Sequence, residues 1–296
     1  MVYNKIVRNF PNDARHSYAI VVGSSPMQRV HEQVTQVAPS SASVLFLGET
    51  GVGKELLAME LHQLSGRQGK FVPVNCTGIP EGLLESIMFG HVKGAYTGAY
   101  ADALGRFEYA NRGAIFLDEV AEMSYALQGK LLRVLQDRVV IRVGDNTERK
   151  VDTRVIAATN RVLRAEVIDG KFRDDLFYRL NVVSIRVPPL RDRRDDIPSL
   201  VDYYLGRYSN EEGRKLMISK EALYKLRAYH WPGNVRELEN FIRKAVLLIG
   251  SLIEPAQSAQ SASTPKAGEA GRTSDLQDKP KNIETAILQA EDVDRL

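Results

Sequence analysis

Three glycines and a lysine stand in the heptapeptide GETGVGK, residues 48–54. The apolar run SVLFLG (43–48) leads into it, and the helical pattern KELLAMELHQL (54–64) continues from it. Glycines let backbone N–H groups close around phosphates, a helix N-terminus adds positive potential, and Lys54 can reach terminal phosphates. The alternative is a glycine-rich turn with a solvated lysine, but the flanking strand and helix favour a nucleotide site. We therefore expect a P-loop that binds ATP through Gly48, Glu49, Thr50, Gly51, Val52, Gly53, Lys54 and Glu55.

Two acids end the buried run AIFLDE, residues 114–119. A strand inside a core avoids carboxylates, because burying an unpaired charge is costly. Asp118 suits Mg²⁺, directly or through water, and Glu119 suits polarising an attacking water. Such a carboxylate is needed because Glu55 stands where generic P-loops carry Ser or Thr on the metal. The alternative is a pair of acids at an exposed strand end.

Two further apolar runs end in polar side chains. FVPVN (71–75) ends in Asn75, and RVIAATN (154–160) ends in Thr159 and Asn160. Ligands bind outside the carboxyl ends of parallel strands, so we expect these side chains to face the γ-phosphate and the acidic pair. The alternative is that Asn ends a strand simply to make a turn.

Apolar runs alternate with helical patterns between residues 19 and 190. Strands are expected at 43–48, 71–75, 114–119, 154–160 and 182–187, and helices at 54–64 and 125–137. Nearly continuous apolar strands between helices predict an α/β fold, with a parallel sheet covered by helices on both faces. Residues 138–155 alternate in period two around Gly144-Asp145-Asn146, which predicts a hairpin.

The remaining segments differ in character. Residues 191–250 lose the strand signal and carry three helical patterns, so we expect a smaller all-helical subdomain there. Residues 1–18 are short and weakly periodic, and we expect a leader without a domain of its own. Residues 251–296 are rich in Ser, Ala, Pro and Gly and lack aromatics, which predicts a disordered polar linker with a short terminal helix.

Composition excludes several classes of protein. With 44% hydrophobic and 26% charged residues, the chain has the balance of a globular protein. A net charge of +3 is too small to demand a nucleic-acid partner. Cys76 is the single cysteine, so no intrachain disulfide can form, and a reducing cytoplasm is the expected location. No apolar run approaches the ~20 residues of a membrane span, and no signal peptide is recognisable.

The string GHVKGAYTGA, residues 90–99, fits neither a helix nor a strand. Glycines cost on the order of 1 kcal/mol each in a helix relative to Ala. The flanking segments nevertheless read as helical or packed sequence. A folded domain therefore presents here a flexible, mostly uncharged loop that carries Tyr96 and Thr97. The alternative is an ordinary glycine-rich surface turn.

With these motifs in this order, the chain resembles the AAA+ ATPase domain of bacterial sigma-54-dependent transcription activators, the enhancer-binding proteins. The likeness runs from about residue 19 to 250 and includes VPVNC, KFRDDLFYRLNV, VPPLRDRRDDI and WPGNVRELEN. That family also carries Glu in its P-loop, as Glu55 does here. The family's hallmark loop reads GAFTGA; in this chain Tyr96 replaces its Phe, and Val92 stands where a Glu is usual.

The resemblance implies further roles. Arg173 and Arg179, in FRDDLFYR, would be arginine fingers that reach the nucleotide of a neighbouring subunit. The alternative is that they pair with the adjacent aspartates on a solvated face. Arg236, in WPGNVRE, would be the sensor II arginine of a helical lid formed by residues 191–250. A capping-box-like helix start places it in a first turn, where it could also be purely structural.

The resemblance also implies the activity and its partners. The chain would hydrolyse ATP with Mg²⁺ in a ring, expected to be a hexamer, and would convert the sigma-54 RNA polymerase closed promoter complex to the open one. The loop would contact sigma-54 through Gly94, Ala95, Tyr96, Thr97, Gly98 and Ala99. Two alternatives stay open: an AAA+ remodeller with another client, and a non-catalytic or weakly catalytic partner subunit in a mixed ring.

Two parts of the family's usual architecture have no counterpart in the sequence. Residues 1–18 are too few for the N-terminal sensory domain. The segment IETAILQ, near the C-terminus, looks like the opening helix of the family's helix-turn-helix, but no turn or recognition helix follows. We therefore expect weak or no sequence-specific DNA binding by this chain alone, and no membrane partner.

Overall fold

The computed structural model describes residues 6–12, 16–211 and 217–248. The chain divides into two units, the first ending at Arg193 and the second beginning at Arg194, and each is described by itself. The expected linker and terminal helix, 251–296, lie outside the described residues.

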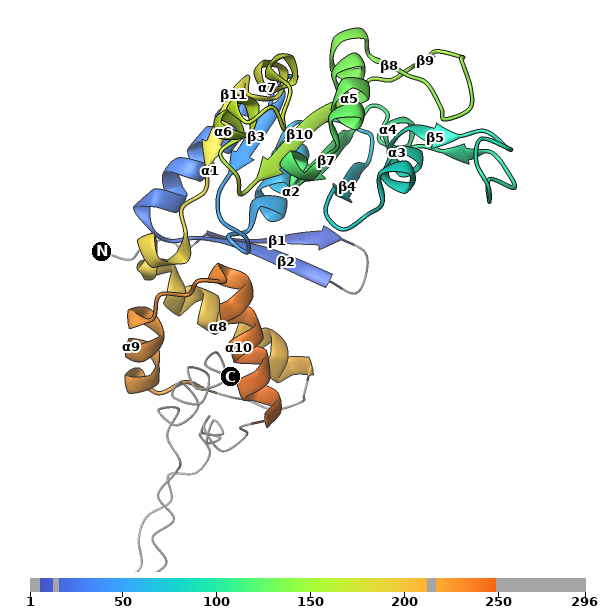
Figure 1. Ribbon diagram of the computed structural model, residues 1–296. Helices are drawn as coiled ribbons and strands as arrows, with labels where there is room; N and C mark the ends of the chain where they lie inside the picture. Colours follow the sequence, from blue (N-terminus) through green and yellow to red (C-terminus); the bar gives the residue numbers. More distant parts are fainter. Residues whose placement is uncertain (1–5, 13–15, 212–216, 249–296) are drawn as a thin grey trace, which may run out of the picture. The chain divides into compact units, whose positions relative to one another are not determined.

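A five-stranded parallel sheet forms the centre of the first unit, in the order β11-β3-β10-β7-β4 (Figure 1). Its strands are β3 (Val44–Leu47), β4 (Phe71–Asn75), β7 (Ala114–Asp118), β10 (Arg154–Thr159) and β11 (Val183–Arg186). Each lies within the range expected from the sequence. The α/β fold with a parallel sheet is therefore confirmed.

Helices cover both faces of this sheet (Figure 1). One face packs against α1 (Ser25–Val37) and α2 (Lys54–Leu64). The other packs against α3 (Glu81–Phe89), α4 (Arg106–Tyr109), α5 (Tyr125–Asp137), α6 (Leu163–Ile168) and α7 (Asp174–Leu180). Short 3-10 turns occur at Val120–Glu122, Leu190–Asp192 and, in the second unit, Arg194–Asp196. The ranges expected for α2 and α5 agree with the structure.

Alternation of side chains along the strands explains the two cores. In β10, Ile156 and Ala158 join the core beneath α1 and α2, whereas Val155 and Ala157 join the opposite core. Because both faces are buried, such strands read as continuous apolar runs. Pro73 is tolerated within β4 because β4 is an edge strand.

Among the described residues, three antiparallel strand pairs accompany the sheet. The sequence did not predict the first, β1 (Ile6–Asn12) with β2 (His16–Val22), which uses residues assigned to the leader. The other two are β5 (Gly90–His91) with β6 (Ala103–Leu104), and β8 (Val139–Val140) with β9 (Arg149–Lys150). The third pair is the hairpin expected around Gly144.

Arg154 is a buried charge that the sequence analysis did not single out. Its side chain is 1% exposed at the start of β10. It donates hydrogen bonds to the backbone oxygens of Val37, Ala38 and Ala42, at 3.1, 2.8 and 3.1 Å. Val37 is the last residue of α1, and the other two follow it. Burial, and secondarily the charge of Arg67, lowers the pKa of Arg154 to about 10, so it stays charged at neutral pH. The guanidinium thus supplies donors that the last turn of a helix lacks.

The second unit is helical in its described residues, with α8 (Ile197–Glu211), α9 (Lys220–Ala228) and α10 (Asn234–Leu248). Its core includes buried Trp231, whose Nε1 donates to the Leu226 oxygen at 2.8 Å. The Tyr208 hydroxyl donates to Glu239 at 2.9 Å and joins α8 to α10. In the part of the chain that the structure describes, no helix is long and apolar enough to cross a membrane.

Candidate functional site

Residues 48–53 connect β3 to α2 and form the P-loop. Gly51 and Gly53 have φ values of 80° and 101°, a left-handed conformation that side chains other than glycine rarely adopt. At Gly48, an added Cβ would lie 2.9 Å from the Val187 oxygen. Glycine is therefore required at two positions by backbone conformation and at the third by a close neighbour.

Lys54 is the first residue of α2, and its side chain is only 6% exposed. Its Nζ donates to the oxygens of Gly48 at 2.8 Å and Glu49 at 3.3 Å. Nζ also lies 3.5 Å from Oε1 of Glu119. Glu55 is exposed in the first turn of the same helix, where a negative charge is favourable. The P-loop thus holds a buried ammonium beside a helix N-terminus.

Asn75 and Asp118 are register partners at the carboxyl ends of β4 and β7. Their strands are adjacent, so the two side chains share the edge of the sheet that the sequence predicted. The Asn75 side-chain oxygen accepts a hydrogen bond from the Thr77 amide at 2.8 Å. The backbone oxygen of Asp118 accepts a hydrogen bond from the Cys76 amide at 3.0 Å. The Asn75 side chain therefore stabilises a turn after β4, which was the alternative to a role at the nucleotide.

Glu119 has a left-handed backbone, with φ 52° and ψ 52°. This conformation is uncommon for a residue with a side chain, and such strain concentrates at functional sites. Its Oε2 accepts from the Asn160 amide at 3.0 Å, while Oε1 faces Lys54. The Asn160 side chain in turn donates to the Thr50 hydroxyl at 3.2 Å. The ends of β7 and β10 and the P-loop therefore meet.

Thr159 is fully buried, and among the described contacts, unlike Asn160, it makes no hydrogen bond to Glu119 or Thr50. Its hydroxyl accepts from the Arg161 amide at 3.1 Å. Its backbone oxygen accepts from the Gly48 amide at 3.2 Å. Thr159 thus anchors the start of the P-loop through its backbone.

Two arginines of the charged run RDRR, 191–194, contact the P-loop and were missed by the sequence analysis. Arg191 forms a bidentate pair with the Glu49 carboxylate at 2.6 and 2.9 Å. Arg193 is buried and donates to the Val52 oxygen at 2.7 Å. No local signal separates these arginines from a solvated charge run, because their partners lie about 140 residues away.

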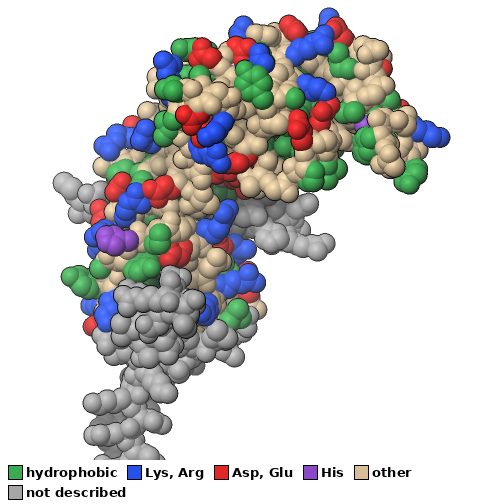
Figure 2. Space-filling view, in the orientation of Figure 1, with side chains coloured by type: hydrophobic (Ala, Val, Ile, Leu, Met, Phe, Trp, Pro, Cys, Tyr) green, Lys and Arg blue, Asp and Glu red, His purple; other side chains and the backbone are tan. Residues whose placement is uncertain are grey.

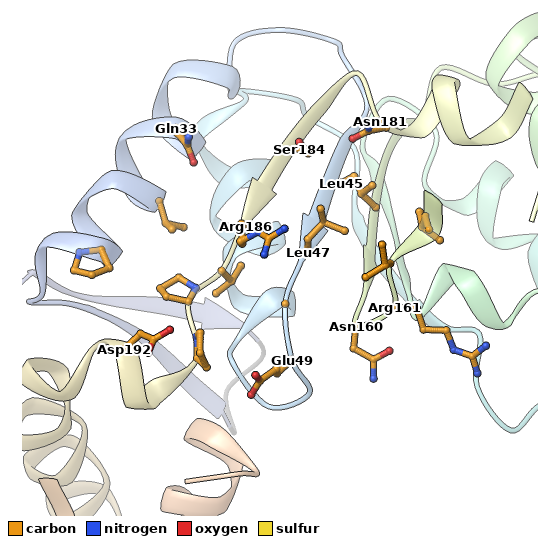
Figure 3. A pocket seen from close by; sticks show the side chains of 18 of the residues that line it. Gln33, Leu45, Leu47, Glu49, Asn160, Arg161, Asn181, Ser184, Arg186 and Asp192 are labelled. Carbon is orange, nitrogen blue, oxygen red and sulfur yellow. The ribbon is translucent and has the colours of Figure 1, made fainter. Parts of the chain in front are cut away.

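A cavity of about 820 Å³ adjoins the P-loop on the β3 and β11 side (Figure 3). Glu49 and Asn160 lie on one side of it, and Asn181 and Ser184 lie near its other end (Figure 3). Gly48 also lines it, so the cavity gives access to the start of the phosphate loop.

Cys76 follows Asn75 and is buried beside the acids. Burial, and then the negative charges of Asp118 and Glu119, raises the pKa of its thiol to about 12. Within the described residues, no group of three or more His, Cys, Asp or Glu side chains could hold a metal ion.

Arg173 precedes α7 and is held within its own chain. Its guanidinium donates to both Asp175 carboxylate oxygens, at 3.0 and 2.8 Å, and lies over the Tyr125 ring at 5.2 Å. The hydrogen bond to Asp175 raises the pKa of Arg173. The pairing of Arg173 with a neighbouring aspartate, which was the alternative to an arginine finger, is therefore present in the single chain.

Arg179 is exposed near the end of α7. It lines a small cavity with Ser43, Val155 and Val182. These three residues lie at the amino ends of β3, β10 and β11. The P-loop follows the carboxyl end of β3, so Arg179 lies at the opposite edge of the sheet from its own P-loop.

Arg236 is exposed in the first turn of α10, in the second unit, as the sequence predicted. The cap at this helix start comes from Glu237, whose carboxylate accepts from the Gly233 amide at 2.7 Å. The described contacts therefore explain how Arg236 is presented at a helix N-terminus.

The connection from β5 to β6, residues 92–102, is called the GAYTGA loop below. Figure 1 shows it extending away from the sheet, next to the connection between β8 and β9. Gly94 and Gly98 have φ values of 81° and 108°. The Gly94 amide donates to the Ala99 oxygen at 2.8 Å, and the Ala99 amide donates to the Tyr96 oxygen at 3.0 Å. The glycines thus provide left-handed turns within a hydrogen-bonded loop.

The GAYTGA loop packs against the tip of the neighbouring hairpin. The Val92 amide donates to the Val143 oxygen at 3.1 Å, and the Val143 amide donates to the Gly90 oxygen at 2.9 Å. A Cβ added at Gly144 would lie 2.7 Å from the Ala95 Cβ. Farther out, Thr97 and Gly98 are exposed. The loop is therefore supported at its base and open at its tip.

Two family models match the chain. The sigma-54 interaction domain matches residues 20–186, more than half of the 296 residues, and the AAA+ ATPase lid domain matches residues 191–270.

The chain is similar to curated bacterial regulators. It is 50% identical over 231 residues to the Nif-specific regulatory protein of Azotobacter vinelandii, covering 77% of this chain and 44% of that protein. It is 44% identical over 289 residues to the regulatory protein AtoC of Escherichia coli K12, covering 93% of this chain and 63% of that protein. It therefore spans less than two thirds of the length of either relative.

Solved structures agree in fold. NtrX from Brucella abortus in complex with ADP superposes with a TM-score of 0.73 at 35% identity, covering 82% of this chain and 52% of that one. A closed-state structure of Hsp104 gives a TM-score of 0.55 at 20% identity, a likeness of fold alone. The resemblance read from the P-loop, the acidic strand and GAYTGA is confirmed. The chain belongs to the sigma-54 interaction domain family, with an AAA+ lid domain after it.

Proposed function

We propose that this chain is an ATP-hydrolysing transcriptional activator that remodels the sigma-54 RNA polymerase closed promoter complex to the open complex. One observation carries the proposal. A single unit holds both a P-loop that meets an acidic strand end and a supported loop that exposes Tyr96, Thr97 and Gly98 of the GAYTGA sequence.

The residues present fit ATP with Mg²⁺. The P-loop offers backbone amides at a helix N-terminus and the buried ammonium of Lys54, which suit phosphates. Mg²⁺ is commonly bound by one or two carboxylates plus phosphate oxygens, so Asp118 alone suffices as a protein ligand, directly or through water. The ion would supply charge neutralisation on the phosphates.

Glu119 is the residue we assign to water activation. The Asn160 amide holds one of its carboxylate oxygens, and Lys54 faces the other. When Lys54 turns to phosphate, Oε1 becomes available to polarise a water. We also assign Asn75, the register partner of Asp118 on the neighbouring strand, to orienting this carboxylate or the water.

We assign Arg173 and Arg179 as fingers that act on a neighbouring subunit. The position of Arg179 at the edge opposite its own P-loop supports supply from another chain. Such a site is complete only in a ring, which we propose is a hexamer. Release of Arg173 from Asp175 is then a condition for its action. Arg236, on the lid, would sense the nucleotide.

The GAYTGA loop would contact sigma-54 through residues 94–99. Its exposed tip, with Thr97 and Gly98, supports that role. Figure 2 shows Lys and Arg side chains interspersed with Asp and Glu on the visible face, without an extended basic area there. We propose weak, non-specific DNA binding by the chain alone, because a net charge of +3 offers little counterion release. We place its action in the cytoplasm.

The deciding experiment incubates the purified chain with sigma-54 holoenzyme, promoter DNA and hydrolysable ATP, and measures open complexes. We expect open complexes from the wild type and none from Lys54→Ala. ATP hydrolysis without open complexes would instead indicate an AAA+ remodeller with another client.

A second candidate, a non-catalytic or weakly catalytic partner subunit in a mixed ring, is favoured by the pairing of Arg173 with Asp175. It predicts little or no turnover by the chain alone but stimulation of a related activator on mixing. Turnover by the chain alone at the rate of the mixture excludes it.

A further inference from the structure

Tyr96 does not simply point into solvent from the GAYTGA loop. Its side chain is 42% exposed, and its hydroxyl lies 3.3 Å from Oγ of Ser86 and 3.5 Å from Nδ1 of His91. Its ring meets the His91 ring edge-on, with centroids 5.1 Å apart and an interplanar angle of 67°. The aromatic residue of the loop tip is therefore engaged inside its own chain.

The partners of Tyr96 lie at the base of the loop. Ser86 lies in α3 and is 6% exposed, and His91 is half-buried in β5. Ser86 Oγ lies 2.7 Å from His91 Nδ1. With Nδ1 unprotonated, the Tyr96 hydroxyl donates to Ser86 and the Ser86 hydroxyl donates to His91, so each hydroxyl is satisfied. The tip is thus tied by a continuous chain of hydrogen bonds to a buried helix residue.

We propose that Ser86 and His91 are positioning residues that latch the Tyr96 hydroxyl, and that this latch restrains the GAYTGA loop until a partner takes the Tyr96 side chain. This inference rests on the proposed function, in which sigma-54 binds the loop. A partner that uses the ring and hydroxyl of Tyr96 must first displace Ser86 and His91. Thr97 and Gly98 remain exposed throughout, so a first encounter does not need release.

Phenylalanine at position 96 would keep the ring contact with His91 and lose the hydroxyl contact. A single neutral hydrogen bond changes a population by roughly twofold to tenfold. The free-loop population should rise by that factor, and the apparent affinity for a partner that needs the free loop should rise with it. The latch thus depends on the one atom that distinguishes Tyr96 from phenylalanine.

Amide hydrogen exchange of the whole 296-residue chain tests the restraint without any partner. The amides of Gly94, Ala95, Ala99 and Tyr100 donate within the loop and report its opening. We expect peptides covering 92–100 to exchange roughly twofold to tenfold faster in Tyr96→Phe and in Ser86→Ala. The double variant should exchange no faster than the faster single variant, because the two changes remove the same contact.

Tyr100→Phe is the matched control. Tyr100 belongs to the same loop and is 87% exposed, so loss of its hydroxyl should leave exchange unchanged. Ser86→Ala also improves helix propensity in α3, so faster exchange in the loop cannot arise from a weaker helix. Wild-type exchange in both Tyr96→Phe and Ser86→Ala would overturn the latch.

Capture of purified sigma-54 in the presence of ADP and aluminium fluoride tests the partner. Tyr96→Phe should bind more tightly than the wild type by about the factor seen in exchange. Faster exchange with unchanged or weaker capture would overturn the link between latch and partner. If the proposed function itself is wrong, the wild type would capture no sigma-54, whatever the exchange rates of the variants. This outcome is distinct from failure of the latch.

Discussion

Lys54 and Glu119 face each other across 65 residues of sequence, with Nζ of the first 3.5 Å from Oε1 of the second. The lysine is the group expected to bind phosphate, and the glutamate is the group expected to polarise water. Their pairing leaves neither charge buried alone, since burying an unpaired charge is costly. It also means that phosphate and Glu119 compete for the same ammonium.

Glu119→Gln should bind ATP about as well as the wild type and lose nearly all turnover. The amide keeps the size of the side chain but cannot polarise water as a carboxylate does, while Asp118 and the P-loop are unchanged. Nucleotide binding and steady-state hydrolysis, measured on the same preparation, check this. Turnover near the wild-type rate would remove Glu119 from the mechanism.

Arg173→Ala should reduce hydrolysis by about a thousandfold or more while each subunit stays folded, because a finger acts on a neighbour's nucleotide. Arg133→Ala is the matched control, since Arg133 is also paired with carboxylates and stands away from the P-loop in α5.

Mixing decides whether Arg173 acts between chains. Arg173→Ala subunits mixed with Lys54→Ala subunits should recover part of the activity at interfaces that combine an intact P-loop with an intact finger. The recovery is measured as hydrolysis across a range of mixing ratios. Absence of recovery at every ratio would contradict the cross-subunit assignment.

Thr97→Ala should leave ATP hydrolysis near the wild-type rate and abolish both sigma-54 capture and promoter opening. The side chain is exposed at the loop tip, so its loss should change the free energy of unfolding by no more than ~0.5 kcal/mol. Parallel assays of hydrolysis, capture and open complexes give the answer. Normal promoter opening would make the loop an ordinary surface turn.

Arg154→Met should lower the free energy of unfolding of the first unit by about 3 kcal/mol. The substitution removes the guanidinium donors of the Ala38 and Ala42 oxygens, whereas the Val37 oxygen keeps its hydrogen bonds from Ser40, and each unsatisfied buried acceptor costs roughly 1–3 kcal/mol. Denaturant titration checks the value, with Arg133→Met as an exposed control expected within ~0.5 kcal/mol. A loss below about 1 kcal/mol would show that the guanidinium does not hold α1.

Cys76 should resist alkylation by iodoacetamide in the native protein from pH 7 to 9. The thiolate is the nucleophile, and a pKa raised to about 12 keeps the thiol protonated throughout this range. In denaturant the pKa returns to its ordinary value near 8.5, and the rate should rise steeply with pH. A fast native reaction at pH 8 would show that Cys76 is accessible and ionised.

The sheet was predictable because its information is local. Runs such as FVPVN and AIFLDE carry the strand pattern and its polar end within a few residues, and the helix at 125–137 has its own periodicity. Strand β1 was not predicted because Ile6–Asn12 reads as mixed and weakly periodic, although its partner β2 is the next strand in the sequence.

The shared sheet edge of several candidate site residues was predictable, but their contacts were not. Asn75 and Asp118 share an edge because parallel strands end together, which the sequence implies. The contacts of Arg193 with Val52, and of Ser86 with Tyr96, depend on chain segments that meet only in the folded protein. The local sequence around Arg193 or Ser86 does not predict these partners.

Strand β10 sets the distance between its attachment to α1 and its attachment to the P-loop. Arg154 at one end holds the last turn of α1, and the Thr159 oxygen at the other end receives the Gly48 amide. At about 3.3 Å per residue, one inserted residue would displace one of these attachments by that length and turn the intervening side chains to the wrong face. The β8–β9 connection, residues 141–148, has no attachment to the P-loop among the described contacts. Strand β10 therefore serves as a spacer whose length the nucleotide site and α1 set together, a constraint that the described contacts do not place on residues 141–148.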